Sequence, residues 1–102
     1  IYACEILFLS KIDPYKKAYL LKSKDYKKIL KNSKKVLSDA IKKGGSSIRD
    51  FKDTAGIKGS FQKEFKVYER EGLKCKRVKC SGVIKRKIIS KRSTYFCNIC
   101  QK

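Results

Sequence analysis

Apolar residues recur at helical spacing near the start of the chain. Within residues 1–10 they are separated by three or four positions, at Ile1, Cys4, Leu7 and Phe8. The segment KIDPY (11–15) follows. Pro14 cannot continue a helix there, because proline lacks a backbone N–H and disfavours the helical region for the residue before it. The pattern predicts the latter part of a buried helix that stops at this segment.

A second, longer helix is predicted from Ser23. The serine side chain can cap its first turn, and Lys42 and Lys43 complement the helix dipole at its end. Gly44 then supplies the left-handed residue that stops a helix. The apolar residues between these ends fall on one stripe: Tyr26, Ile29, Leu30, Val36, Leu37, Ala40 and Ile41.

The segments after this helix are less regular. In GGSSIRDF (44–51), Ser46 or Ser47 can cap a short helical turn whose amides would bind a phosphate. The same residues also fit a tight turn without a ligand, and both readings stay open. DTAGIKGSFQ (53–62) has the composition of a mobile loop. FKVYERE (65–71) alternates apolar and polar residues, which predicts a strand.

Basic residues dominate the charge of the chain. There are 28 lysines and arginines against 9 acidic residues, and residues 73–102 contain ten basic side chains and no acidic one. Such clustering favours a polyanionic partner, most often nucleic acid. An AT-rich coding sequence is the plainer explanation, because 23 of the 28 are lysine. The chain has no apolar run long enough for a membrane span, and IYACEILFLS is too short and too acidic for a secretory signal.

Four cysteines form two short pairs in the last third of the chain. Cys75 and Cys80 make C-x4-C, and Cys97 and Cys100 make C-x2-C after sixteen intervening residues. This is the spacing of a four-thiolate zinc ribbon, in which one structural zinc ion is coordinatively closed. Two disulfides in a secreted cationic peptide are the alternative, but they need an oxidising compartment. Cys4 lies in the apolar helix and is predicted to be a core residue.

The stretch VIKRKIISKRSTYF (83–96) between the cysteine pairs has strand character at both ends. It predicts a hairpin whose strands and tip carry a basic run from Lys85 to Arg92, suited to pressing cationic groups onto phosphates. Arg92 is the candidate for a specific contact, because a guanidinium binds phosphate through two donors. It would otherwise be one solvated charge among many.

Four blocks carry a family resemblance that extends over essentially the whole chain: IYACEILFLSKIDP, AIKKGGSSIRDF, GSFQKEFKVYEREGLKC and RSTYFCNICQK. In this order they resemble the C-terminal half of formamidopyrimidine-DNA glycosylases. The resemblance implies a mainly α fold with a small β zinc-ribbon hairpin. A helix–two-turn–helix region would occupy residues 1–64, with a lesion-capping loop at 53–62, and a four-cysteine zinc finger would occupy residues 65–102. The family's N-terminal β-sandwich would be missing, and the lack of any methionine fits a fragment.

The resemblance also implies roles for particular residues. The four paired cysteines match the zinc ligands, and Arg92 matches the hairpin arginine that grips phosphates beside the extruded nucleotide and is associated with δ-elimination. The expected DNA contacts are Arg92, Lys91, Lys58, Ser46 and Ser47. Two departures stand out: the first cysteine pair has four intervening residues where the family usually has two, and GIKG replaces the family's usual lysine and proline within the lesion loop.

The function implied is base excision repair. The whole protein would remove 8-oxoguanine and ring-opened purines from double-stranded DNA and nick the abasic strand by β,δ-elimination, as a monomer in the bacterial cytoplasm at the nucleoid. The fragment alone would be inactive, because the proline nucleophile and its neighbouring glutamate are absent. Two alternatives remain: an endonuclease VIII-type glycosylase for oxidised pyrimidines, and a non-catalytic zinc-ribbon module that binds nucleic acid.

Overall fold

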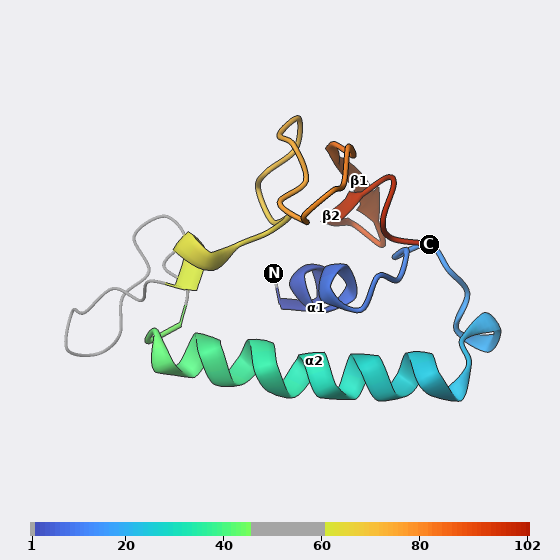
Figure 1. Cartoon of the computed structure of the whole chain (residues 1–102), viewed down its shortest axis with the longest axis horizontal. Helices are drawn as coiled ribbons and strands as arrows, with labels where there is room; N and C mark the ends of the chain where they lie inside the picture. Colours follow the sequence, from blue (N-terminus) through green and yellow to red (C-terminus); the bar gives the residue numbers. More distant parts are fainter. Residues whose placement is uncertain (1, 46–60) are drawn as a thin grey trace.

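The computed structural model describes residues 2–45 and 61–102. Two helices are followed by a short antiparallel hairpin, and the long second helix lies along one side with the hairpin on the other (Figure 1). The elements in chain order are α1 (Tyr2–Leu9), η1 (Ala18–Leu20), α2 (Ser23–Lys42), η2 (Phe61–Glu64), β1 (Ile84–Ile89) and β2 (Arg92–Cys97). Over the described ranges, we find no helix with the length and apolar character needed to cross a membrane.

Helix α1 ends well before Pro14. The amide of Lys11 donates to the carbonyl of Phe8 at 3.1 Å, and the amide of Ile12 donates to the carbonyl of Leu7 at 3.0 Å. Lys11 has a φ of 59°, so a lysine takes the left-handed position that closes a helix in this pattern. The predicted first helix is therefore confirmed over the described residues, and the chain has already turned when it reaches the proline.

Helix α2 begins at Ser23 and stops before Gly44 as predicted, but the predicted cap is wrong. Gly44 has a φ of 73°, and Gly45 donates its amide to the carbonyl of Ala40 at 2.7 Å, as in a Schellman ending. At the other end Ser23 is inside the helix and does not cap it. The cap is the carboxylate of Asp25, which accepts the amide of Lys22 at 2.9 Å.

Only part of the predicted apolar stripe of α2 is buried. Val36 and Ala40 pack with Phe61 and Phe65, and side chains from α1 complete this cluster. Other members of the stripe are largely exposed: Tyr26, Leu30, Leu37 and Ile41. The reason is the width of the stripe: successive residues are turned by about 100° around a helix, so Leu37 and Ile41 point away from the face on which the neighbouring Val36 and Ala40 are buried.

The strand predicted for residues 65–71 is wrong. The chain turns there because the buried carboxylate of Glu5, on α1, takes up three consecutive backbone amides. Glu5 accepts the N–H of Lys66 at 2.7 Å through Oε1, and those of Val67 and Tyr68 at 2.9 Å through Oε2. These amides are therefore satisfied without a neighbouring strand.

The predicted hairpin is confirmed. β1 and β2 pair in antiparallel register from Ile84 with Cys97 at the base to Ile89 with Arg92 at the tip. Its base belongs to a core that also contains Cys4 and Phe8 of α1 together with Val67. Cys4 is thus a buried core residue, as predicted. This shared core attaches the hairpin directly to the first helix.

Candidate metal centre and nucleic-acid interface

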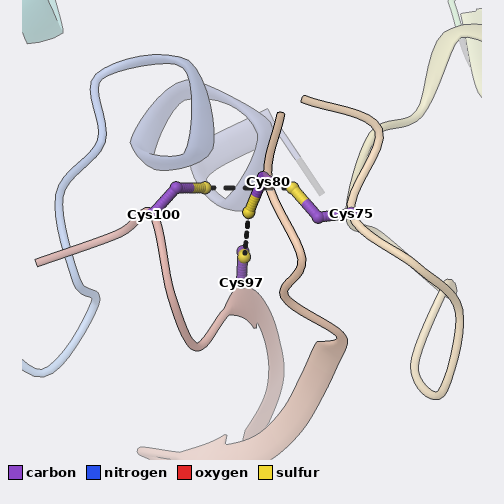
Figure 2. A group of neighbouring side chains, drawn as sticks. All are labelled: Cys75, Cys80, Cys97 and Cys100. Atoms are coloured by element: carbon purple, nitrogen blue, oxygen red, sulfur yellow. Dashed lines mark hydrogen bonds between the residues drawn. The ribbon is translucent and has the colours of Figure 1, made fainter. Parts of the chain in front are cut away.

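Four cysteine sulfurs converge at the base of the hairpin (Figure 2). The Sγ atoms of Cys75 and Cys100 lie 3.8 Å apart, those of Cys80 and Cys97 lie 3.6 Å apart, and all four lie within 4.8 Å of one another. A tetrahedral ion with zinc–sulfur bonds of about 2.3 Å requires sulfur–sulfur distances of roughly 3.8 Å. A disulfide requires about 2.05 Å. The thiols are therefore positioned to hold one structural zinc ion.

Backbone amides around the sulfurs suit the thiolate form. The amide of Arg77 points to Sγ of Cys75, and that of Gly82 points to Sγ of Cys80, each at 3.4 Å. Gly82 is also required for space, because a Cβ at this position would lie 2.5 Å from Sγ of Cys97. The residues two positions after Cys75 and Cys80 therefore help to shape the site.

The thiols of Cys75 and Cys97 differ in acidity. Burial raises the pKa of Cys75 to about 12, and its contacts with the other thiols add to the rise. Burial also raises the pKa of Cys97, but hydrogen bonds from the amides of Cys100 and Ile99 outweigh it and bring the value to about 7. Metal binding must displace the remaining thiol protons, so zinc uptake releases protons.

The four residues between Cys75 and Cys80 include an arginine, Arg77, that contacts helix α1. The guanidinium of Arg77 lies over the ring of Phe8, with 4.5 Å between Cζ and the ring centroid, and donates to the carbonyl of Phe8. Nearby, Nζ of Lys76 donates to the carbonyl of Phe65 at 3.3 Å. The four-residue spacing still brings the sulfurs close enough for one ion. Two of the residues between the cysteines, Lys76 and Arg77, join the metal centre to the preceding part of the chain.

The second cysteine pair is tied to the same end of α1. The side chain of Gln101 is 3% exposed; it accepts the amide of Cys97 at 2.8 Å and donates to the carbonyl of Ile12 at 2.9 Å. The amide of Lys102 donates to the carbonyl of Lys11 at 3.1 Å. Both halves of the metal centre are therefore attached to the first helix and the turn that follows it.

At the other end of the hairpin, the cationic tip is open to solvent. Arg92 begins β2 directly after a tight turn in which Ser90 and Lys91 have φ values of 48° and 67°. Lys91 and Arg92 are both exposed. Ser46, Ser47 and Lys58, the other DNA contacts expected from the sequence, lie outside the described residues, as does most of the expected lesion-capping loop.

Three residues that position the site were not predicted from the sequence: Glu5, Arg77 and Gln101. Glu5 had a usable signal, since a single carboxylate within an apolar helix requires buried partners. The partners themselves are 61 to 63 positions away, and no local pattern specifies them.

Comparison with known proteins supports the same architecture. The family described as "Formamidopyrimidine-DNA glycosylase H2TH domain" matches residues 1–52, and "Zinc finger found in FPG and IleRS" matches residues 72–102. This chain belongs to the formamidopyrimidine-DNA glycosylase family. The family assignment agrees with the resemblance, the fold class and the zinc ion expected from the sequence.

Two bacterial relatives are named formamidopyrimidine-DNA glycosylase. The one from Roseobacter denitrificans is 45% identical, over all of this chain and 36% of the relative. The one from Bradyrhizobium diazoefficiens is 46% identical, over all of this chain and 37% of the relative. The chain thus spans about a third of the length of these family members. Among solved structures, the Lactococcus lactis protein in complex with abasic-site DNA matches with a TM-score of 0.90 and 37% identity, over 100% of this chain and 36% of that one. A mutant of the same protein bound to Fapy-dG DNA gives the same TM-score and identity.

Proposed function

We propose that this chain is the DNA-binding part of a bifunctional glycosylase and abasic-site lyase that removes oxidised purines, namely 8-oxoguanine and formamidopyrimidines, and nicks the resulting abasic strand by β,δ-elimination. One observation carries the proposal. Cys97, a zinc-site thiol, and Arg92, an exposed cation, stand at opposite ends of one six-residue strand. The strand therefore joins a buried anchor to a phosphate-binding group.

The chemistry that we assign to Arg92 is electrostatic. An arginine stays protonated at any pH at which DNA repair occurs, so it is a poor proton donor. Its guanidinium can instead hold a phosphate through two donors and stabilise charge that develops on the sugar–phosphate backbone during strand cleavage. Family resemblance supports the same assignment, with Lys91, Lys58, Ser46 and Ser47 as further DNA contacts.

Zinc bound by four thiolates is coordinatively closed and supplies shape to the hairpin. The residues of this chain grip and position DNA, and we propose that the chain alone does not cleave it, because its single proline, Pro14, lies inside the chain between the two helices. We also retain the boundary between a helical region (1–64) and a zinc finger (65–102) as a proposal, with one core shared across it.

The partner in this proposal is damaged double-stranded DNA, with the protein acting as a monomer. The Lactococcus lactis complexes with abasic-site and Fapy-dG DNA support this choice. The bacterial origin of the relatives supports a place in the bacterial cytoplasm at the nucleoid.

A chimera tests the proposal. The chain replaces the matching third of the Roseobacter denitrificans relative, and strand nicking is measured on duplexes that carry 8-oxoguanine or thymine glycol. We expect nicking of the first substrate by the chimera and none by the chain alone. Preference for thymine glycol would support an endonuclease VIII-type enzyme instead.

An inactive chimera that still binds abasic-site DNA would support the non-catalytic zinc-ribbon module. The matched control is the intact relative carrying the same purification tag, assayed in parallel on both duplexes. Its activity shows that the substrates and conditions permit cleavage.

A further inference from the structure

The register of the hairpin sorts the basic run by face. Partners directly across an antiparallel pair project from the same face, and alternate residues along a strand project from opposite faces. One face therefore carries the pairs Lys85–Phe96, Lys87–Thr94 and Ile89–Arg92. Lys85, Lys87 and Arg92 are all exposed, and we call these three side chains the basic strip.

Arg86 belongs to the opposite face. Its guanidinium donates to Oγ of Ser93 through Nε at 3.1 Å and through a terminal nitrogen at 2.8 Å. Tyr95, its cross-strand partner, is buried. Burial raises the pKa of the Tyr95 phenol, and the carboxylates of Glu71 and Glu69 raise it further. The Arg86 face is thus engaged with its own protein and lies near acidic groups.

The apolar part of the basic-strip face is covered. The rings of Tyr15 and Phe96 meet edge to face with 6.1 Å between their centroids, and Phe96 is only 9% exposed. Tyr15 comes from the segment between the two helices, where its amide donates to the carboxylate of Asp13 at 2.8 Å. This packing closes the base of the face, so the long cationic side chains of Lys85 and Lys87 are what the strand presents above it.

The basic strip has a geometry that suits a nucleic-acid backbone. Same-face residues on a strand are spaced by about 6.7 Å, and residues 73–102 contain no carboxylate side chain to neutralise them. Among the described ion pairs, none involves these three residues. Cations on one face of two paired strands, without an acidic partner among the described ion pairs, can bind successive phosphates.

We propose that Lys85 and Lys87 extend the phosphate contact of Arg92 along the hairpin, so that one face of β1 and β2 follows a DNA strand beyond the damaged nucleotide while Arg86 does not contact it. The inference rests on the proposed DNA-binding function and deepens it. It divides a run of adjacent basic residues into two that bind DNA and one that stabilises the hairpin.

The salt dependence of binding tests the division. The zinc-loaded chain is titrated with a fluorescent duplex containing a tetrahydrofuran abasic-site analogue, at several salt concentrations between 50 and 200 mM. Each lost phosphate contact should reduce the slope of log affinity against log salt by about 0.9. For the double variant Lys85→Gln/Lys87→Gln, we expect the affinity loss across this salt range to be about tenfold smaller than for the unchanged chain.

The matched control is Lys27→Gln/Lys31→Gln, which removes the same charge from exposed positions on α2. Its slope should equal that of the unchanged chain. Equal slopes for the two double variants would overturn the inference, as would loss of zinc or of helix signal in the strip variant. If the unchanged chain itself shows no salt-dependent binding, the proposed DNA-binding function fails, and the strip assignment fails with it.

Discussion

The carboxylate of Glu5 accepts the backbone N–H of Val67 at 2.9 Å, across 62 positions of sequence. It accepts two neighbouring amides as well, and Val67 is fully buried. This contact fixes the course of the chain at residues 66–68, between η2 and the first zinc-site cysteine. Glu5 therefore joins Arg77, Gln101 and the shared core in holding the first helix against the zinc site.

Replacing Glu5 should destabilise the whole chain. Glu5→Ala leaves three amides without acceptors, and each unsatisfied buried group costs about 1–3 kcal/mol. We expect a loss of about 3–5 kcal/mol, measured by urea unfolding of the zinc-loaded chain. Glu64→Ala is the control, since Glu64 is half exposed and its ion pair with Lys43 is long, at 3.9 Å. Equal losses for both variants would contradict the role given to Glu5.

Two glycine variants distinguish the effect of a steric clash from that of a strained backbone conformation. Gly82→Ala places a Cβ against Sγ of Cys97 and the side chain of Ile99, so we expect weaker zinc binding in a competition with a chromogenic chelator. Gly72→Ala meets open space but has a φ of 82°. It should cost about 1 kcal/mol of stability and leave zinc affinity unchanged. Normal zinc affinity in Gly82→Ala would mean that the chain around Cys80 and Cys97 accommodates the added methyl group without disturbing the metal ligands.

Arg92→Ala should weaken DNA binding without affecting the metal. A charge-assisted hydrogen bond contributes about 1.5–3 kcal/mol, so the dissociation constant for abasic-site DNA should rise about 10- to 100-fold. Strand cleavage by the chimera should fall with it, while zinc content measured by atomic absorption stays at one ion per chain. Loss of zinc would instead make Arg92 part of the fold.

Removal of zinc should unfold the hairpin. With the cysteines kept reduced, a chelator should abolish the tertiary signal of the buried Tyr95, whereas a reductant alone should leave it unchanged, because the sulfurs are held by a metal and not by disulfides. Re-addition of zinc should restore the signal and release protons, detectable with a pH indicator in weak buffer. Unfolding by reductant alone would favour the disulfide alternative.

Helix α2 should depend on pH through Asp25. The hydrogen bond from the Lys22 amide holds the pKa of this carboxyl below its ordinary value of 3.8, although desolvation opposes it. A lowered pKa stabilises the folded state above the unfolded value, and the stabilisation is lost as the pH falls below about 3.8 through the folded value. The acid transition should therefore be weaker in Asp25→Asn, followed by circular dichroism at 222 nm. An unchanged transition would exclude this cap.

The sequence predicted the parts of the site that depend on short spacings. The cysteine pairs, the intervening hairpin, the stop at Gly44 and the burial of Cys4 all follow from residues close together in the chain. The strand at 65–71 failed for a different reason: its alternation was real, but the amides were taken by Glu5. Ser23 failed as a cap because Lys22 takes the N-cap position, which makes Ser23 the first residue of the helix itself.

The exposed residues of the α2 stripe are another case in which a local sequence pattern did not determine the structure. Periodicity places Leu30 and Ile41 on an apolar face of the helix, but burial depends on what lies opposite, and in the described part of the chain the packed residues cover the side of Val36 and Ala40 instead. The division of the basic run into two faces likewise required the register of the hairpin, which composition does not contain.

A small rotation at the cysteine end of the six-residue strand β2 displaces its arginine end by a larger distance. Arg92 stands five residues from Cys97, or about 17 Å along an extended strand. A tilt of about 10° at the cysteine end would move the arginine by roughly 3 Å over that length, which is as long as a hydrogen bond. The buried Gln101 and the partly buried Arg77, which both bind to the first helix or the turn after it, therefore help to set the position of the hairpin tip. A small displacement at the cysteine end becomes a larger one at Arg92.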